Sequence, residues 1–307
     1  MRPTGKLHLG NLQGALKNWV DLQNDGRHDC FYFVADWHAL TSDYSTPDQI
    51  RENSLDMVID WLSVGLDPEK STLFVQSSIK EHAELYLLLG MITPLPWLER
   101  NPTYKEMRDE LTEKDLGTYG FLGYPVLQAA DIIIYKGQGV PVGVDQLPHV
   151  ELTREIARRF NFLYREVFPV PDPLLTAVPK LLGIDGRKMS KSYGNSIYIG
   201  DEGDALKTKV SAMFTDPQRM RRKDPGNPDI CNVYSFHQLY TEESEVAQIN
   251  TDCRTAGIGC TDCKKRLYER MLLAMSPIHE RRNHYCQHPD LVRDIIEKGN
   301  SKAAAVA

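Results

Sequence analysis

The chain lacks the features that mark membrane, secreted and low-complexity proteins. No apolar run approaches the ~20 residues that a membrane-spanning helix needs. No basic segment followed by an apolar one opens the sequence, as a secretory leader would. Apolar residues at 41% and charged residues at 25% are ordinary for a folded protein, which argues against a disordered or collagen-like chain. We therefore expect a cytoplasmic protein whose 307 residues form one large domain or two ordinary ones.

Cysteine is sparse except in one segment. Six cysteines are present, and Cys30 and Cys286 stand apart from the other four. Those four have the spacing C-x21-C-x6-C-x2-C, which ends in a close pair typical of metal ligands. In a cytosolic chain such a cluster indicates a metal site more readily than disulfides, and four thiolates suit zinc or an iron–sulfur cluster. Four unligated thiols are the alternative. The expected ligands are Cys231, Cys253, Cys260 and Cys263.

Two runs of basic residues flank these cysteines, although the formal net charge of the chain is −6. The runs consist of Arg219, Arg221, Arg222 and Lys223 before the cluster, and of Lys264, Lys265 and Arg266 after it. Local patches rather than net charge steer nucleic acids, so these runs fit contacts with a phosphate backbone. A solvated charged helix face is the plain alternative.

The first half of the chain alternates strand and helix patterns. Short apolar runs predict buried strands, and apolar residues at helical spacing predict the helices between them. We expect strands at residues 31–35, 72–75 and 140–142, and helices at residues 10–23, 46–62 and 81–92. This order predicts an α/β fold with a Rossmann-like, doubly wound parallel sheet.

The second half has a different character. From about Asp204 onward the chain is more polar and its pattern is helical, with no convincing strand. We therefore expect a catalytic α/β domain at residues 1–195 and a helical domain at residues 196–307.

A turn that begins at Thr4 precedes the first expected helix. A helix start offers unpaired N–H groups and the positive end of the helix dipole, which suits a phosphate. Gly5 and Gly10 would let a ligand approach the backbone, and His8 can donate to a phosphate oxygen. A loop with two turn glycines and a surface histidine is the alternative. The dinucleotide and P-loop fingerprints are absent from the sequence.

The segment Lys188–Ser192 contains two lysines and two hydroxyls, and Gly194 follows it. A mobile cationic loop of this kind can close on a polyphosphate and stabilise the charge that develops when pyrophosphate leaves. A generic surface loop is the alternative.

Residues 8–11 and 188–192 resemble the two signature motifs of class I aminoacyl-tRNA synthetases. Between them, residues 124–131 and 141–146 are similar to motifs of bacterial tryptophanyl-tRNA synthetases, and the resemblance covers nearly the whole chain. It implies that ATP activates L-tryptophan to tryptophanyl-adenylate, which is then transferred to tRNA(Trp) with release of AMP and pyrophosphate. It also implies Mg²⁺ beside ATP and a homodimer. The cysteine pattern resembles a subset that carries a [4Fe-4S] cluster in the anticodon-binding domain, so we prefer that cluster to Zn²⁺.

The resemblance implies a tryptophan site around Asp131, which matches the carboxylate that accepts the indole N–H. An indole is donor-only, and a site built to satisfy that donor rejects analogues that lack it. A helix-capping or ion-paired Asp131 is the alternative, and His38 at a strand end is as easily a packed core histidine as a pocket residue. The expected tryptophan site consists of Asp131, Tyr124, Gln128, Gln146, His38, Val140 and Val142.

The resemblance also implies a site for ATP. Its expected members are Arg2, Pro3, Thr4, Gly10, Asn11, Gly143, Val144, Asp145, Lys188, Met189, Ser190, Lys191 and Ser192. The expected catalytic residues are His8, Lys188 and Lys191, which would act by positioning and electrostatics. Val144 replaces an acidic residue that is common in the family motif, so the charge near the ribose is expected to differ.

Three alternatives compete with this interpretation. A tyrosyl enzyme also carries Tyr, Gln and Asp on one helix, but the small Ala129 and Ala130 beside Asp131 leave room for the larger indole. An adenylyltransferase for small molecules would share the His8 turn and would not need a basic helical domain. A non-catalytic paralogue disagrees with the intact His8, Asp131, Lys188 and Lys191.

Both ends of the sequence look shortened relative to that family. Several residues that usually precede Arg2–Gly5 form the first strand, so we expect that strand and one wall of the amino-acid pocket to be missing. Residues 303–307 resemble a helix cut short.

Overall fold

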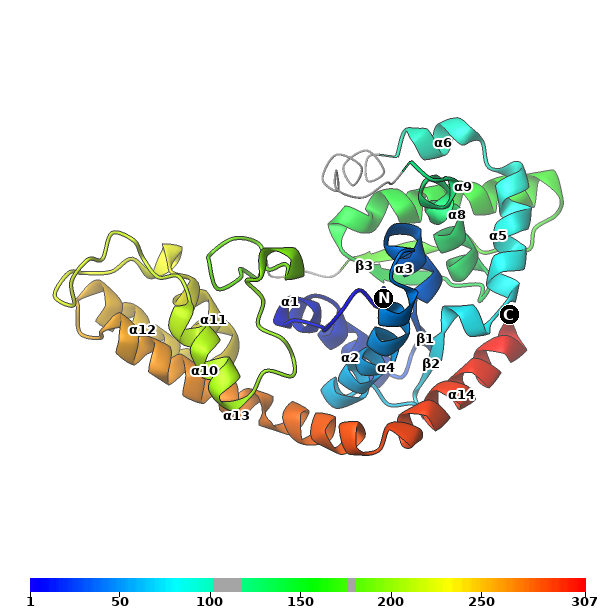
Figure 1. Cartoon of the computed structure of the whole chain (residues 1–307). Coiled ribbons are helices and arrows are strands. Elements are labelled where there is room, and N and C mark those ends of the chain that lie inside the picture. Colours follow the sequence, from blue (N-terminus) through cyan, green and yellow to red (C-terminus); the bar gives the residue numbers. More distant parts are fainter. Residues whose placement is uncertain (102–116, 176–180) are drawn as a thin grey trace. The chain divides into compact units, whose positions relative to one another are not determined.

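The structure is a computed structural model that describes residues 1–101, 117–175 and 181–307 (Figure 1). These residues separate into two units, each of which is described by itself. The first unit takes its residues from the ranges 1–6, 14–178 and 285–307, and the second from 7–13 and 179–284. The expected domains, 1–195 and 196–307, divide the chain differently and stay a prediction.

The described residues of the first unit form four strands, in two parallel pairs. Strand β1 (Cys30–Val34) pairs with β2 (Ser71–Val75), and strand β3 (Gly139–Val142) pairs with β4 (Asp172–Leu175). The apolar runs therefore predicted three of the four strands correctly. They did not predict β4, whose Pro173 lacks an N–H and lies in a stretch punctuated by proline. Together with the helices between them, the parallel strands confirm the expected α/β class.

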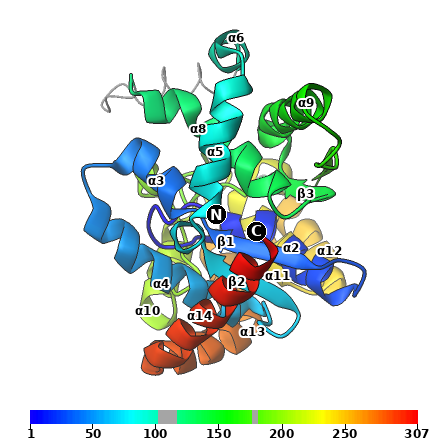
Figure 2. The same ribbon diagram turned by 90° about the vertical axis from the view of Figure 1, so that its right-hand side faces the viewer.

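Helices surround these strands (Figures 1 and 2). They are α2 (Lys17–Asn24), α3 (Asp36–Asp43), α4 (Pro47–Val64), α5 (Glu81–Ile92), α6 (Leu95–Glu99), α8 (Tyr119–Ile133), α9 (Leu147–Leu163) and α14 (Pro289–Val306). Helix α4 begins at a proline, whose fixed φ suits a first turn, and ends at Gly65 with a φ of +113°. The helix expected at 10–23 consists of three pieces, α1 (Leu9–Asn11), a π-helical turn (Leu12–Leu16) and α2.

The C-terminal helix α14 packs against β2 within the first unit (Figure 2). A side chain on Gly299 would place its Cβ 1.8 Å from the Leu73 carbonyl oxygen, so only glycine allows this close approach. Beside it, the Asn300 side-chain oxygen accepts the Val75 N–H at 3.0 Å. Residues of the C-terminal helix thus pack against and hydrogen-bond to β2, a strand of the N-terminal part of the chain.

The second unit is helical, as expected for the later part of the chain. Its helices are α10 (Gly203–Ala212), α11 (Asn232–Tyr240), α12 (Glu243–Arg254) and the first part of α13 (Cys260–Gln287). Phe236, Leu267 and Met271 are buried between them. The segment around His8 joins this unit because its backbone pairs antiparallel with Ile197–Ile199.

Candidate functional site

The His8 turn is held at the start of α1 by backbone pairing. The Leu9 N–H donates to the Ile197 carbonyl and the Ile199 N–H to the Leu7 carbonyl, both at 2.9 Å. The Asn11 side-chain oxygen accepts the His8 N–H at 3.0 Å. The strand-like entry and the following helix therefore meet at His8, as the sequence predicts for an anion site.

The His8 imidazole lies over Gly10. A Cβ at Gly10 would come within 2.9 Å of the ring, which gives this glycine a steric role. Burial, with a smaller effect of the nearby Lys191 charge, lowers the pKa of His8 to about 4. The ring is therefore neutral at neutral pH, and its buried Nδ1 has no hydrogen-bond partner in the described part of the chain. The arrangement suits a neutral donor that turns toward a bound oxygen.

The loop Lys188–Ser192 belongs to the same unit and is anchored at Asn195. The buried Asn195 amide accepts the Ser190 N–H at 2.9 Å and donates to the Lys188 carbonyl at 3.1 Å and to Asp185 at 2.7 Å. Met189 is buried, whereas Lys188 is exposed and Lys191 is half-buried. Asn195 therefore fixes the backbone of the loop, while the side chains of Lys188 and Lys191 stay at least partly accessible to solvent. Asn195 was not predicted from the sequence, although an Asn after a turn glycine is a typical loop-stabilising signal.

Asp131 lies on α8 in the first unit and is 3% exposed. Its carboxylate is surrounded by donors from other segments. Gln76 Nε2 donates to Oδ1 at 2.8 Å and to Oδ2 at 3.0 Å. His38 Nε2 lies 2.7 Å from Oδ2, and His82 Nδ1 lies 2.5 Å from Oδ1. The expected pair His38 and Asp131 is thus in direct contact. Gln76 and His82 were not predicted. Gln76 follows the end of a predicted strand, the same signal that marks His38, whereas nothing in the local sequence marks His82.

Asp131 is ionised in spite of its burial. Burial favours the neutral acid, but the hydrogen bonds from His38 and His82 outweigh it and lower the pKa of Asp131 to about 2. A buried, permanently charged acceptor results, and its neighbours supply only donors. Such a group can recognise a ligand N–H.

Tyr124 lies on α8 and faces His38 and His149. Its ring centroid is 6.2 Å from that of His38, and its hydroxyl is 3.0 Å from His149 Nε2. Burial raises the pKa of Tyr124 to about 12 and lowers the pKa of His149 to about 4, so both side chains are neutral and Tyr124 donates to His149. His149 also contacts Asn101. It therefore orients Tyr124, a member of the expected tryptophan-binding site.

The other expected residues of the first unit occupy its strands and turns. Gln128 is half-buried on α8, and Val140 and Val142 are half-buried on β3. Gly143 precedes a one-turn 3₁₀ helix, Val144–Gln146, in which the Gln146 side chain donates to the Asp145 carboxylate at 3.0 Å. A Cβ at Gly143 would come 2.6 Å from the Asp145 carboxylate, so that carboxylate lies close against the Gly143 backbone. Val144 and Asp145 are exposed, and Pro3 is buried between the half-buried Arg2 and the exposed Thr4.

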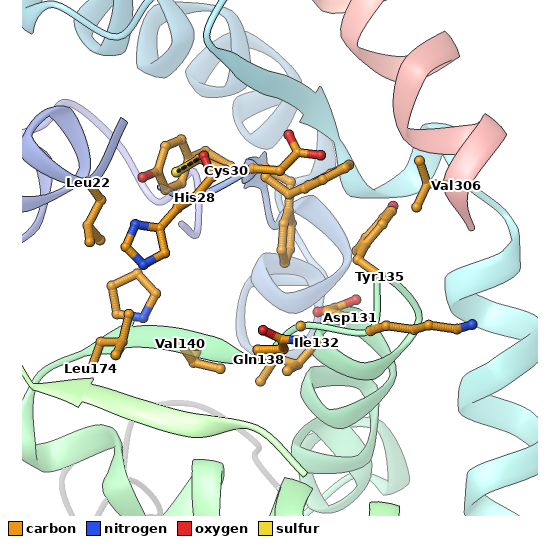
Figure 3. A pocket seen from close by; sticks show the side chains of 18 of the residues that line it. Leu22, His28, Cys30, Asp131, Ile132, Tyr135, Gln138, Val140, Leu174 and Val306 are labelled. Atoms are coloured by element: carbon orange, nitrogen blue, oxygen red, sulfur yellow. Dashed lines mark hydrogen bonds between the residues drawn. The ribbon is translucent and has the colours of Figure 1, made fainter. Parts of the chain in front are cut away.

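A cavity of about 420 Å³ lies between β1 and β3 (Figure 3). Cys30 lines it from β1, Val140 from β3, Asp131 from α8, and Tyr135 from the turn just after α8. At the other end of β1, the Met1 carbonyl accepts the N–H of Ala35, the residue after the strand, at 2.8 Å. The cavity places apolar walls beside the charged Asp131.

The four expected cysteine ligands all lie in the second unit. Cys231 caps α11, Cys253 lies in α12, and Cys260 and Cys263 lie in the first turn of α13. Burial raises the pKa of Cys263 to about 12, with smaller contributions from the other three thiols. No group of three or more potential ligands close enough to hold a metal ion is found within residues 1–101, 117–175 and 181–307.

Arg219 and His237 surround these thiols. Arg219 Nη1 is 3.9 Å from the sulfurs of both Cys253 and Cys260, and its buried Nε has no partner in the described structure. His237 Nε2 is 3.5 Å from the Cys263 sulfur. Gly226 leaves the space that Cys253 occupies, because a Cβ there would be 2.6 Å from the sulfur. The surroundings of the thiols thus offer hydrogen-bond donors.

The expected residues fall into two groups. The structure brings His8, Gly10 and Asn11 into one unit with residues 188–192. It places Arg2–Thr4, the residues around Asp131 and the turn at Gly143 in the other unit. His149, Gln76 and His82 join the second group as residues that the sequence did not reveal.

A family model described as class I tRNA synthetases (W and Y) matches residues 1–275. Among known proteins, a tryptophan–tRNA ligase from Thermotoga maritima is 56% identical over 308 residues, which cover all of this chain and 94% of the relative. Another from Aquifex aeolicus is 45% identical and is covered to 95%. Among solved structures, a tryptophanyl-tRNA synthetase from Campylobacter jejuni, complexed with ADP and tryptophane, matches the whole chain with a TM-score of 0.91 and 35% identity, over 94% of its own length.

Proposed function

The chain belongs to the class I tRNA synthetases of the tryptophan and tyrosine group, and on this basis we propose how its residues divide the reaction. It is a tryptophan–tRNA ligase: it activates L-tryptophan with ATP to tryptophanyl-adenylate and transfers the tryptophanyl group to tRNA(Trp), with release of AMP and pyrophosphate. The observation that carries the assignment of residues is the buried, ionised Asp131.

Asp131 selects the amino acid in this proposal. Its carboxylate accepts the indole N–H, the one polar group of the tryptophan ring. Tyr124, Gln128 and Gln146 bind the ammonium and carboxylate groups of the substrate, and His38, Val140 and Val142 line the ring. An acceptor held by three side-chain donors cannot turn to suit a substrate that lacks the N–H.

ATP is handled by the His8 turn and the Lys188–Ser192 loop. His8 donates to a phosphate oxygen as a neutral imidazole, and Gly10 lets the phosphate approach the helix start. The tryptophan carboxylate attacks the α-phosphorus in line, and Lys188 and Lys191 stabilise the charge on the departing pyrophosphate. The remaining expected residues, Arg2, Pro3, Thr4, Asn11, Gly143, Val144, Asp145, Met189, Ser190 and Ser192, shape the nucleotide site.

Mg²⁺ is expected with ATP in this class of enzyme. Among the described residues, no group of three or more potential metal ligands is found. When bound, Mg²⁺ supplies positive charge to the triphosphate. The lysines of the Lys188–Ser192 loop act on the same oxygens from the protein side.

A [4Fe-4S] cluster on Cys231, Cys253, Cys260 and Cys263 is part of the proposal. Two features support it: the four thiols influence one another, and the Arg219 Nε beside them is a buried donor without a partner in the described structure. The cluster would fix the ends of three helices. Zn²⁺ is the alternative. Anaerobic purification followed by iron, sulfide and zinc analysis tests the assignment, and stoichiometric zinc without sulfide would contradict it.

The basic runs and an apolar helix face provide the surfaces for partners. Arg221, Lys223, Lys265 and Arg266 are exposed and would contact the tRNA phosphates. On α5, Leu87 and Met91 are 62% and 72% exposed, and an apolar face of this kind marks an interface. We propose a homodimer that covers it. A Met91→Glu variant that sediments as a dimer like the wild type would contradict this surface.

The location follows from the reaction. Every helix in the described part of the chain is too short or too polar to span a bilayer. A synthetase that charges tRNA works where protein synthesis takes place, so we propose the cytoplasm.

ATP–pyrophosphate exchange tests the function directly. The purified chain is incubated with ATP, labelled pyrophosphate and either tryptophan, tyrosine or no amino acid. We expect exchange with tryptophan only. Exchange that depends on tyrosine, or on no amino acid, would refute the function, and the second outcome would favour a small-molecule adenylyltransferase.

A further inference from the structure

We propose that His82 is a positioning residue for tryptophan selection: it fixes Asp131 through Oδ1, so that Oδ2 accepts the indole N–H when His38 gives way. The inference rests on the proposed function and extends it to a residue outside the expected site. His82 lies at the start of α5, 49 residues before Asp131 in the sequence.

The number of donors around Asp131 shows that one of them must leave. A carboxylate offers about four accepting positions, two on each oxygen. His82 and Gln76 occupy Oδ1, and His38 and Gln76 occupy Oδ2. All four positions are therefore taken before tryptophan arrives, and an indole N–H can bind only where a present donor withdraws.

His82 cannot be that donor. Its side chain is fully buried, and its ring packs beside the rings of Phe33 and Phe74 at centroid distances of 5.9 and 6.2 Å. Its second nitrogen, Nε2, lies 2.7 Å from the Tyr135 hydroxyl. Moving the ring would break both polar contacts and open a void in a packed core.

His38 is the donor that can withdraw. Its side chain is 8% exposed, in contrast to the fully buried His82, and its ring edge faces the ring of Tyr124, an expected pocket residue. Gln76 is also fully buried, and its amide spans both carboxylate oxygens. Withdrawal of His38 frees a position on Oδ2 and leaves Oδ1 fully supported.

Asp131 and Tyr135 determine the direction of the hydrogen bonds. Burial, with smaller contributions from Asp131 and Glu81, raises the pKa of Tyr135 far above neutrality, so its hydroxyl keeps the proton. The ionised Asp131 can only accept, so the ring hydrogen of His82 lies on Nδ1 and points at Asp131, and the Tyr135 hydroxyl donates to His82 Nε2. Tyr135 and His82 thus form a chain of donors that ends at the carboxylate.

The test compares three variants by ATP–pyrophosphate exchange. The substrates are tryptophan and its benzothiophene analogue, in which sulfur replaces the indole N–H. His82→Leu removes both polar contacts. His82→Asn keeps a donor near the position of Nδ1. Tyr135→Phe keeps the ring packing and removes only the hydroxyl. Circular dichroism confirms that each variant is folded.

We expect His82→Leu to raise the KM for tryptophan about tenfold, as the loss of one hydrogen bond to a charged group would. The KM for ATP and for the analogue should stay the same, so the preference for tryptophan falls by the same factor. His82→Asn should restore most of it, and Tyr135→Phe should lower it by a smaller factor. If His82→Leu is unfolded, Tyr135→Phe alone carries the test.

Equal losses with both substrates would overturn the inference, because a merely structural residue affects both alike. An unchanged preference in every folded variant would overturn it as well. Failure of the proposed function is distinguishable, because the wild-type chain would then show no tryptophan-dependent exchange at all.

Discussion

The surroundings of Asp131 and those of the Lys188–Ser192 loop differ in how they hold charge. Asp131 is buried and bound by side chains from three separate segments. The loop is held through its backbone by the single side chain of Asn195, and its lysines remain at least partly exposed. A buried charge needs fixed partners, since desolvation costs several kcal/mol. A charge that meets a triphosphate must stay accessible.

The two regions suit different tasks because they hold their charges differently. The fixed carboxylate discriminates between substrates, because its neighbours hold it in one position. The lysines instead contribute long-range attraction, which depends little on exact orientation. Specificity and catalysis therefore depend on different physical terms in this enzyme, and substitutions should separate them.

Asp131→Asn should have the largest effect. The amide replaces one acceptor oxygen by a donor, which then faces donors from His38, Gln76 and His82. We expect kcat/KM for tryptophan in the exchange reaction to fall by a factor on the order of 10⁴, as for sites that lose their one polar match. Asp294→Asn, the same change at an exposed position of α14, is the matched control and should leave activity unchanged. A fall of less than tenfold would remove Asp131 from selection.

Lys191→Ala should have a smaller effect of a different kind. Removal of one charge near the departing pyrophosphate should lower kcat for adenylate formation about 100-fold. The dissociation constant of tryptophan should change less than twofold, measured by equilibrium titration without ATP. Lys265→Ala in the basic run after the cysteines is the matched control. Equal losses in tryptophan binding and in adenylate formation would contradict the division between the two regions.

The smallest effect concerns stability against pH. His149 has a pKa near 4 when folded, against 6.5 ordinarily, because burial disfavours its charged form. Between these values the unfolded chain binds the proton and the folded chain does not, so stability falls as the pH is lowered from about 6.5 to 4. His149→Gln, which keeps a polar group beside Tyr124, should reduce this loss by an amount on the order of 2 kcal/mol in urea unfolding. An unchanged pH slope would show that His149 does not titrate in this range. The pKa of His8 is also lowered to about 4, so His8 should likewise make the folded state less stable as the pH falls.

Local sequence patterns predicted the individual strands and helices better than they predicted which of these elements pack against each other. The apolar runs predicted β1, β2 and β3 because a buried parallel strand is apolar over its whole length. They missed β4, whose Pro173 lacks a donor. The helical pattern after residue 204 was also correct, but no periodicity states that α14 lies against β2.

The site shows the same limit. The residues of the His8 turn and the Lys188–Ser192 loop are marked by their local sequence, because helix starts and turns have local rules. Gln76 is marked only as the residue after a strand, and His82 has no local mark at all. They reach Asp131 across 55 and 49 residues, and only the fold brings them together.

The class of fold, the family and the residue types available for chemistry can be read from the amino-acid sequence, because they depend on local patterns and motifs. The tertiary structure decided which donors surround Asp131 and that they hold it ionised. It also showed that the His8 turn belongs with the Lys188–Ser192 loop and that Gly299 lets α14 approach β2. These outcomes depend on burial and on contacts between distant segments, which local sequence does not encode.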